Sequence, residues 1–473
     1  IMQILLEGSD AHYTLEQLAQ TLFAGEELEI RCRVSQTQAR INAICRITRA
    51  GRQSRACAWS AKPEDAYACR HAHRLTLARA LYRAALPLLD VPPEWGMLSG
   101  VRPAKLVRAQ LEAGKSPQQA QRWLERTYFV TPQKARLCTQ AAEAAFSAQE
   151  SLRPRDILLY VHIPFCPSRC SYCSFVSMSA GDYARYGEAY FRALMRELNA
   201  LEALVHACQL HVRAIYIGGG TPAVLDAESL SGLCARLHAL APAAEFTVEA
   251  GRPDVIDAQK LAALRESGVQ RVCVNPQTLH NRTLAAIGRR HTSADFYQAF
   301  ALARQADFRA VNVDLIAGLP GETEADFQNT LDAVAALAPE NVTVHTLAVK
   351  RSSFLNEAAY QPAPAQRLHT MLDYAGTTLA RMGYVPYYLY RQKNMGGSFE
   401  NVGFAQPGEE CFYNICMMEE IGDVIALGAG ASTKLTRHGI RRRVNPKYPR
   451  EYITRIDEIL SDFDWMKRYF YEE

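Results

Sequence analysis

The sequence predicts an α/β protein built on a partial (β/α)6 barrel, with an α+β N-terminal region and a mixed C-terminal extension. Three observations predict this class. Six short apolar runs rich in β-branched residues alternate with amphipathic helical segments between residues 157 and 361. Six such units fall short of the eight of a complete barrel. The alternation is absent before and after that range. A doubly wound open sheet is the alternative topology.

The composition is that of an ordinary globular protein. Of the 473 residues, 48% are hydrophobic and 22% are charged, which excludes disordered and fibrous classes. The net charge of +4 is too small over this length to favour nucleic acid as a partner. There is no apolar run long enough for a membrane span, and the N-terminus has no basic leader. We therefore expect a cytoplasmic protein with reduced thiols.

Residues 1–150 are predicted to form a separate accessory domain, either α+β or mostly helical. A long helix is expected over 66–86, where apolar residues recur at helical spacing and Pro87 ends the pattern. Two further helices are expected before residue 149. The short strands predicted in this domain cover residues 2–6, 28–34 and 43–47.

The barrel is predicted over residues 157–361 and follows a linker at 151–156. Its strands are expected at 157–163, 214–217, 246–249, 271–274, 311–316 and 342–349. Its helices are expected at 183–204, 258–267, 294–306 and 324–337. The polar residues that follow the strands should then gather at one end of the barrel, where the active sites of such folds lie.

Residues 362–473 are predicted to be an extension that packs on the barrel and covers the substrate. A helix over 365–382 leads to strands at 384–391 and 424–427. One final helix is expected over 449–469.

Three cysteines directly follow the first barrel strand. Cys166, Cys170 and Cys173 have the spacing CxxxCxxC. A structural zinc site takes four ligands, and the next cysteine, Cys208, lies beyond the following helix. Three thiolates suit a 4Fe–4S cluster that leaves one iron open. The alternative is three unrelated buried cysteines, which this spacing and position disfavour.

This loop resembles the signature of the radical S-adenosylmethionine (SAM) superfamily. The resemblance implies that Cys166, Cys170 and Cys173 bind the cluster, and that the amino and carboxylate groups of SAM chelate the open iron. It also implies that Tyr172 shields the cluster and touches the adenine. An electron from the reduced cluster would cleave SAM to methionine and a 5′-deoxyadenosyl radical.

The next two strand ends extend the resemblance. Gly219, Gly220 and Thr221 belong to a GGGTP run, whose exposed backbone groups can bind the methionine ammonium. Taken by itself, the run is equally compatible with an ordinary turn. Glu249 ends the third strand, and the resemblance implies that it holds the ribose hydroxyls.

Three further residues complete the implied SAM site. Gln277 follows the fourth strand, and Arg289 follows the next helix as a bidentate partner for the SAM carboxylate. Asp314 lies in a segment that resembles the adenine-contacting part of the family. For Asp314 and Glu249 the competing interpretation is a satisfied polar residue that caps a strand.

The motifs point to one branch of the superfamily. Residues 160–166 (YVHIPFC), 218–222 and 314–320 resemble the oxygen-independent coproporphyrinogen III oxidase (HemN-like) branch. Segments at 100–103, 387–395 and 427–432 resemble its HemZ type. The implied reaction is the oxidative decarboxylation of two propionates to vinyl groups, which gives protoporphyrinogen IX. The chain would then be a radical SAM oxidoreductase of haem synthesis.

The implied partners are an anionic tetrapyrrole and a low-potential electron donor such as flavodoxin or ferredoxin. Cations for the carboxylates are expected at Arg391, Lys393 and the run 441–443, although a solvated surface also explains that run. Tyr160 is a candidate catalytic residue, and Tyr390 another aromatic that could line the site. Whether one SAM or two binds is left open.

One departure from the branch leaves alternatives open. The HemN proteins carry another cysteine two positions after the third ligand, where this chain has Phe175. That pattern is closer to HemZ and to HemW, the haem-chaperone relatives. A haem-binding or haem-trafficking protein is therefore the first alternative, with His162 or His345 as axial candidates that more simply read as core histidines. The second alternative is a radical methyltransferase or a haem-degrading relative.

The other ten cysteines, among them Cys411 and Cys416, are expected to be reduced and mostly structural.

Overall fold

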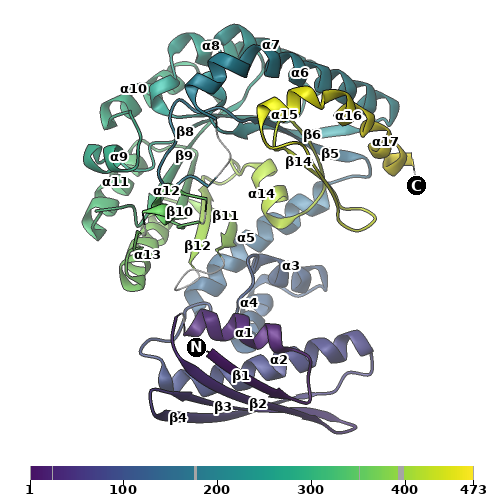
Figure 1. Cartoon of the computed structure of the whole chain (residues 1–473), viewed down its shortest axis with the longest axis vertical. Coiled ribbons are helices and arrows are strands. Elements are labelled where there is room, and N and C mark those ends of the chain that lie inside the picture. Colours follow the sequence, from purple (N-terminus) through teal and green to yellow (C-terminus); the bar gives the residue numbers. More distant parts are fainter. Residues whose placement is uncertain are drawn as a thin grey trace. The chain divides into compact units, whose positions relative to one another are not determined.

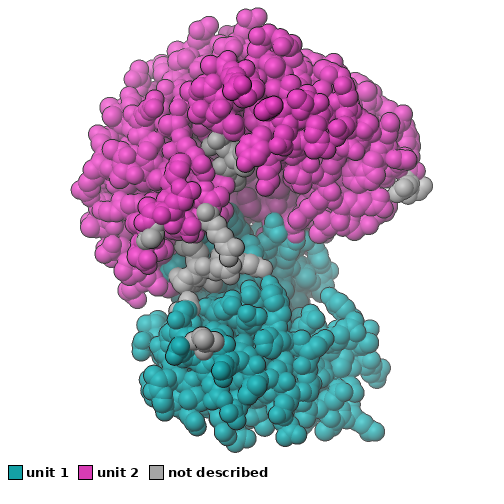
Figure 2. Space-filling model, in the orientation of Figure 1, with its two compact units in different colours: residues 1–143, 389–400 teal, residues 144–388, 401–473 magenta. Residues whose placement is uncertain are grey.

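The computed structural model describes residues 2–23, 25–174, 178–350, 352–358, 360–392 and 399–471. The chain divides into two compact units (Figure 2). Unit 1 comprises Ile1–Glu143 and Leu389–Glu400, and unit 2 comprises Ala144–Tyr388 and Asn401–Glu473. The division of the chain into three domains at residues 150 and 361 stays a prediction.

Unit 1 contains a four-stranded sheet with helices on one side (Figure 1). Its strands are β1 (Met2–Glu7), β2 (Leu28–Gln36), β3 (Arg40–Arg49) and β4 (Arg52–Ala61), in that order across the sheet. The helix α1 (His12–Leu22) joins β1 to its parallel neighbour β2, and α2 (Ala66–Ala85) packs on β3 and β4. Strand β3 alternates buried and exposed residues, as expected for a sheet with one covered face.

The segment after α2 contains one helix more than expected. The structure has three helices after α2 instead of two: α3 (Ala104–Glu112), α4 (Pro117–Tyr128) and α5 (Pro132–Ser151), preceded by the short η1 (Leu86–Leu88). Gly114, with φ +79°, and the Ser116 N-cap separate α3 from α4. The predicted strands and the predicted helix at 66–86 are present, whereas α1 and β4 were not predicted.

Two of the ten cysteines expected to be reduced are paired instead. Cys32 of β2 and Cys45 of β3 form a disulfide. They lie directly opposite each other in the antiparallel register, with a Cα–Cα distance of 4.2 Å. The cysteine count could not reveal this pairing, because it depends on the register of two strands.

Unit 2 is built on six consecutive parallel strands, which confirms the predicted mixed α/β class. They are β5 (Asp156–Ile163), β6 (His211–Gly219), β7 (Glu245–Gly251), β8 (Arg271–Val274), β9 (Ala310–Ala317) and β10 (Asn341–Thr346). The last strand ends three residues earlier than expected.

Helices alternate with these strands and lie along the outer side of the sheet (Figure 1). They are α6 (Ala180–Ala207), α7 (Ala227–Leu240), α8 (Ala258–Glu266), α9 (Asn281–Ala286), α10 (Ser293–Gln305) and α11 (Glu324–Ala336), with the short turns η2 (Pro222–Val224) and η3 (Pro253–Val255). Capping boxes start α6, α10 and α11, since a Ser or Thr and an Asp three residues later satisfy each other's backbone N–H.

The C-terminal part adds strands to both ends of the same sheet. The complete order is β11-β12-β10-β9-β8-β7-β6-β5-β13-β14-β15. The added strands are β11 (Val385–Arg391), β12 (Glu400–Ala405), β13 (Asp423–Leu427), β14 (Ser432–Leu435) and β15 (Arg441–Val444). Strand β13 lies parallel to β5 and is completely buried, so it is part of the core.

The remaining helices are α12 (Phe354–Glu357), α13 (Ala365–Arg381), α14 (Phe412–Glu419), α15 (Pro449–Thr454), α16 (Ile456–Ser461) and α17 (Phe463–Tyr471). The expected single final helix is therefore wrong: three short helices occupy its place. In the described part of the chain, no helix combines the length and apolar character that a membrane span needs.

Candidate functional site

Polar side chains mark the inner side of the six parallel strands. Tyr160 of β5, Glu249 of β7, Asp314 of β9 and His345 of β10 are each partly accessible in strands that are otherwise almost completely buried. Apolar strands that keep polar positions partly open line a ligand site more often than a core. The structure thus brings these four residues of distant sequence to one side of one sheet.

The three cysteines follow β5 in a loop; they are half-buried and none of them forms a disulfide. Backbone hydrogen bonds fix both ends of the loop. The N–H of Cys166 donates to Met178 (2.9 Å), and that of Cys173 donates to Cys170 (3.1 Å). The hydroxyl of Thr221 lies 3.5 Å from Cys166 Sγ. The loop is therefore held so that its thiols stay accessible.

Segments from elsewhere in unit 2 hold the middle of the loop. The N–H of Ser171 donates to Ile287 (2.9 Å), and Leu355 donates to the carbonyl of Ser171 (3.0 Å). Arg169 donates to Ser352 (2.7 Å), and its guanidinium lies over the Phe354 ring. Tyr172 packs against an apolar cluster, whose buried members are Leu284, Ile287, Ile316, Leu319, Leu347 and Leu355.

The glycine run after β6 cannot accept side chains. A Cβ on Gly219, whose φ is +110°, would lie 2.6 Å from the His162 ring, and one on Gly220 would lie 2.4 Å from the Phe165 carbonyl oxygen. Thr221 is buried, and its N–H donates to the same carbonyl (2.8 Å). The glycines therefore let the backbone after β6 pass close to the cysteine loop.

Glu249 has an unusual ionisation. Its carboxylate accepts a hydrogen bond from Tyr216 (2.6 Å). Burial, the largest cause, and the nearby Asp314 together raise its pKa to about 7, against the lowering effect of Tyr216. Glu249 also contributes to raising the pKa of Tyr160, for which burial is the larger cause. A carboxyl that is half protonated near neutral pH can accept or donate hydrogen bonds, for example to the hydroxyls of a sugar.

Asp314 behaves in the opposite way. Burial would raise its pKa, but His345 and the polar neighbours Asn312 and Thr343 together hold it below its usual value. Its carboxylate accepts from Asn275 (2.9 Å) and Asn312 (2.8 Å), and lies 3.9 Å from His345 Nε2. His345 is therefore the partner of an interior carboxylate.

The other predicted SAM residues lie beside the loop. Arg289 Nη1 donates to the Tyr172 hydroxyl (3.4 Å), whose pKa burial raises. Gln277 has φ +71° and bonds through its backbone to Asp314 and Ile316. A residue other than glycine in this region is strained, and such strain gathers at functional sites.

Unsatisfied polar atoms supply a test of whether a cofactor fits. Gln277 Oε1, Arg289 Nε and Ser171 Oγ are buried and have no hydrogen-bond partner among the described residues. Buried polar atoms are rarely left without partners, so these three fit a polar ligand such as SAM.

The donor set also fits a cluster better than a single ion. In the described part of the chain, no three His, Cys, Asp or Glu side chains converge as ligands of one metal ion. A 4Fe–4S cluster does not need such convergence, because each thiolate binds a different iron. The three half-buried thiols of this loop, none of them in a disulfide, are therefore suited to a cluster.

The sequence analysis missed several residues of this region. Arg252, at the end of β7, is buried and donates to Ser168 inside the cysteine loop. Its position three residues after Glu249 was the available signal. The rings of Tyr160, Tyr216 and Tyr413 also stack, with the closest centroids 4.6 Å apart. Tyr413 comes from α14, and no sequence signal placed it there.

The cations expected to bind an anionic substrate have other partners. Arg391 is buried in unit 1, where it donates to the Leu98 carbonyl (2.5 Å) and its guanidinium lies over the Trp95 ring. In β15, Arg442 pairs with Glu420 (3.2 Å) and Arg443 with Asp462 (2.5 Å), while Arg441 lies over the Tyr469 ring. The assignment of Arg391 to the substrate is therefore wrong. Lys393 and Phe175 lie outside the described residues.

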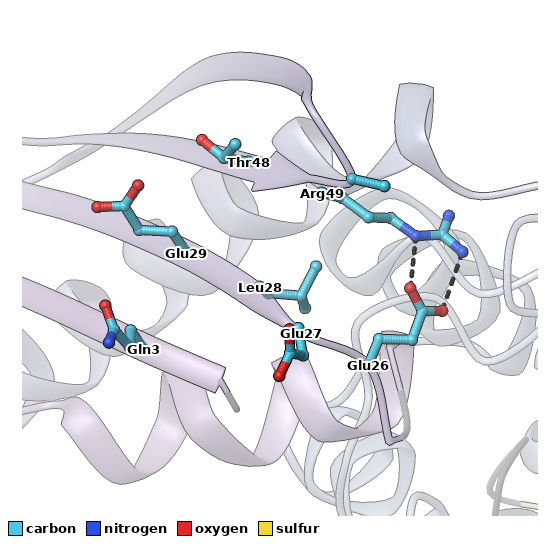
Figure 3. A pocket seen from close by; sticks show the side chains of 8 residues that line it. Gln3, Glu26, Glu27, Leu28, Glu29, Thr48 and Arg49 are labelled. Atoms are coloured by element: carbon cyan, nitrogen blue, oxygen red, sulfur yellow. Dashed lines mark hydrogen bonds and ion pairs between the residues drawn. The ribbon is translucent and has the colours of Figure 1, made fainter.

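A separate cavity of about 560 Å³ lies in unit 1. Figure 3 shows Glu26 bound by the Arg49 guanidinium there, at 2.5 and 2.9 Å. Its lining consists of Gln3, Glu26, Glu27, Leu28, Glu29, Thr48, Arg49 and Ala50. None of the predicted site residues belongs to it.

Comparison with known proteins gives a consistent family. The model of the radical SAM superfamily matches residues 160–334. The oxygen-independent coproporphyrinogen-III oxidase-like protein HemZ of Bacillus subtilis is 37% identical over 383 residues, or 79% of this chain and 76% of that protein. The haem chaperone HemW of Escherichia coli is more distant, at 28% identity over 62% of this chain and 75% of that protein.

A solved structure supports the same fold. Coproporphyrinogen III oxidase (HemN) from Escherichia coli, described as a radical SAM enzyme, matches with a TM-score of 0.52 and 24% identity. The match covers 67% of this chain and 73% of that one.

Proposed function

Because this chain belongs to the radical SAM superfamily, we propose that it decarboxylates the propionates of coproporphyrinogen III oxidatively, with a 4Fe–4S cluster and SAM as cofactors. The observation that carries the proposal is the similarity to the HemZ protein over most of both chains. The half-buried thiols of the cysteine loop, which form no disulfide, and the unsatisfied polar atoms beside it support the cofactor part.

The cofactors supply the hard chemistry: when bound, they deliver a 5′-deoxyadenosyl radical that removes a hydrogen atom from an unactivated carbon. For each propionate, the β-carbon loses that hydrogen atom, the bond to the carboxylate breaks to release CO₂, and one electron passes to an external acceptor. A vinyl group remains.

In this proposal the residues of the chain bind and orient. Cys166, Cys170 and Cys173 would hold the 4Fe–4S cluster. Tyr172, which packs against the apolar side chains around Leu284 and Ile287, would shield it. The backbone of Gly219 and Gly220, with Thr221, accommodates the SAM methionine. Such positioning accounts for much of the rate when a reactive group must be placed against one carbon.

Four side chains complete the SAM contacts. Glu249 holds the ribose hydroxyls, for which a carboxyl with a pKa of about 7 is suited. Arg289 pairs with the SAM carboxylate through the part of its guanidinium that Tyr172 does not use. Gln277 and Asp314 lie together, because the Gln277 N–H donates to the Asp314 carbonyl (3.1 Å), and this segment would contact the adenine. Tyr160 faces the inner side of the sheet as a candidate to contact the substrate.

Anaerobic turnover with product identification tests this function. Purified protein is loaded with iron and sulfide, reduced with dithionite or flavodoxin, and incubated with SAM and coproporphyrinogen III. The expected products are protoporphyrinogen IX, CO₂ and 5′-deoxyadenosine. Formation of 5′-deoxyadenosine without a vinyl product would overturn the proposal. The Cys166→Ala, Cys170→Ala, Cys173→Ala triple variant is the control and should form none of these products.

A second candidate is a haem-binding protein, which the similarity to HemW proteins favours. It predicts stoichiometric uptake of haem by the purified chain with little turnover of SAM. A haem titration followed by absorbance, carried out beside the turnover assay, separates the two candidates.

A further inference from the structure

Arg252 ties the end of strand β7 to the cysteine loop. Its side chain is 4% exposed. Nη1 donates to both the carbonyl (3.1 Å) and the hydroxyl (2.7 Å) of Ser168, which lies between Cys166 and Cys170. The Ser168 hydroxyl in turn donates to the Gly288 carbonyl (3.0 Å). One guanidinium group thus fixes the middle of the segment that carries the first two thiols.

The guanidinium is oriented by a carboxylate on its other side. Nε donates to Asp254 Oδ1 (2.9 Å) and Nη2 to Asp254 Oδ2 (2.7 Å), which is the bidentate geometry that fixes an arginine most firmly. Asp254 in turn lies 3.9 Å from His291 Nδ1. The positive end of this pair, the buried Arg252 guanidinium, therefore points at the cysteine loop, and its negative end points away.

The two charges of this pair stabilise each other. Burial alone would lower the pKa of Arg252, but Asp254 raises it. Burial would likewise raise the pKa of Asp254, and Arg252 holds it below its usual value. The pair is thus an ionised cation and carboxylate, in a region where charges are less screened than in water.

We propose that Arg252 is a positioning residue that orders the Cys166–Cys170 segment and raises the reduction potential of the cluster bound there. The proposal rests on the cofactor part of the proposed function, not on the tetrapyrrole substrate. A fixed positive charge beside the thiolates stabilises the reduced cluster, which carries one more negative charge than the oxidised one. The cluster accepts its electron from the low-potential donor more readily as a result.

If Arg252 only held the cysteine loop in place, its role would not predict whether a substitution raises or lowers the reduction potential of the cluster. Arg252→Gln removes the positive charge, whereas Asp254→Asn keeps Arg252 and removes the negative charge behind it. If charge matters, the two substitutions shift the potential in opposite directions. If Arg252 only holds the loop, both weaken the loop and cannot give opposite signs.

The test is a redox titration of the cluster-loaded protein with dithionite, followed by electron paramagnetic resonance without any tetrapyrrole. For Arg252→Gln we expect the equilibrium constant for reduction to fall about tenfold, which is about 59 mV for a one-electron couple. Asp254→Asn should shift the potential upward, and Arg252→Lys should stay closer to the native protein than Arg252→Gln does. Arg236→Gln is the matched control, because Arg236 pairs with Glu202 on the outer helices.

Shifts of the same sign in the Arg252→Gln and Asp254→Asn variants, or no shift in either, would overturn the proposal. Iron and sulfide content is measured on every variant. If Arg252→Gln does not retain a cluster, the proposal is decided by two other measurements. These are the direction in which Asp254→Asn shifts the reduction potential and the difference in potential between Arg252→Lys and the native protein. A native protein that binds no cluster would instead overturn the cofactor part of the proposed function, so the two failures are distinguishable.

Discussion

Two buried polar clusters of unit 2 differ in how completely their hydrogen bonds are satisfied. In the first, the carboxyl of Glu197 on α6 accepts from the Gly428 N–H (2.8 Å), Asn445 (2.8 Å) and Tyr452 (2.5 Å). In the second, beside the cysteine loop, Gln277, Arg289 and Ser171 each keep a buried polar atom without a partner among the described residues.

The difference separates a structural cluster from a binding site. A satisfied buried cluster stabilises the fold, because breaking it leaves donors that no water can reach. An unsatisfied one destabilises the free protein and gains its partners when a ligand binds. The strain at Gln277 belongs to the second cluster and has no counterpart at Glu197. Substitutions in the two clusters should therefore affect different measurements.

The largest effect is expected at the cysteine loop. Replacing Cys166, Cys170 and Cys173 together by alanine should abolish iron binding and the brown iron–sulfur absorbance, with little change in the thermal unfolding of the metal-free chain. The thiols are half-buried and contribute little to the core. Iron content and near-ultraviolet absorbance measure the loss. The control is Cys57→Ala, an exposed free cysteine in β4. Retention of iron by the triple variant would contradict the assignment.

The next effect should appear only in stability. Glu197→Ala leaves three buried donors unsatisfied and opens a cavity, and should lower the free energy of unfolding by about 3–5 kcal/mol. Urea denaturation measures it. Glu188→Ala, on the same helix with an 86% exposed side chain, should change it by less than about 1 kcal/mol. Equal effects of the two substitutions would show that the Glu197 cluster does not stabilise the fold.

Glu249 differs from both buried polar clusters because its contribution to the free energy of unfolding should depend on pH. Its pKa is about 7 when folded, against 4.5 ordinarily, so the folded chain binds the proton more tightly than the unfolded one. Its contribution to stability is complete below pH 4.5 and is lost as the pH rises through 7. Relative to Glu249→Gln, the native chain should lose up to about 3 kcal/mol across this window.

Urea denaturation at a series of pH values, in the absence of cofactors, measures this difference. Comparison with the variant cancels the opposite contribution of other groups, such as His291, whose pKa burial lowers to about 4. The control is Glu228→Gln, which removes an exposed carboxyl on α7 and should leave the pH profile of the native chain unchanged. Parallel profiles of native chain and Glu249→Gln would contradict the raised pKa.

The smallest effect is expected for the affinity of SAM at Arg289, whose buried Nε has no hydrogen-bond partner among the described residues. Arg289→Lys keeps the charge but loses the fork that pairs with a carboxylate, and should weaken SAM binding to cluster-loaded protein about tenfold. Equilibrium dialysis under anaerobic conditions measures the affinity. Arg282→Lys, at an exposed arginine that pairs with Asp326, should leave it unchanged. Equal affinities of all three proteins would remove Arg289 from the SAM site.

The sequence predicted what depends on local pattern. Apolar runs and helical spacing located the six parallel strands and four of the six helices that alternate with them (α6, α8, α10 and α11), and the spacing of three cysteines located the candidate site. Because parallel strands end at one side of a sheet, Glu249 and Asp314 could be brought together in advance. The opposite pKa shifts of these two residues could not be predicted from the sequence, since the shifts depend on which neighbours the fold places beside each carboxyl.

What was missed depends on contacts between distant segments. The pairing of Cys32 with Cys45 follows from strand register, and the burial of Arg391 follows from the packing of its segment in unit 1. Arg252 follows strand β7 and was not singled out in the sequence, and only the fold places Ser168 against it. Strand β13 is a short apolar run that gave no sign of its neighbour β5.

The pairing of β5 with β13 determines the order in which unit 2 can be completed during synthesis. Strand β5 leaves the ribosome first among the parallel strands, while its partner on one side is among the last segments made. Until β13 emerges, one edge of a nascent hydrophobic sheet is unpaired, and such edges are prone to intermolecular association. The cysteine loop directly follows β5, so its thiols are synthesised long before β13, the strand that completes the pairing of β5.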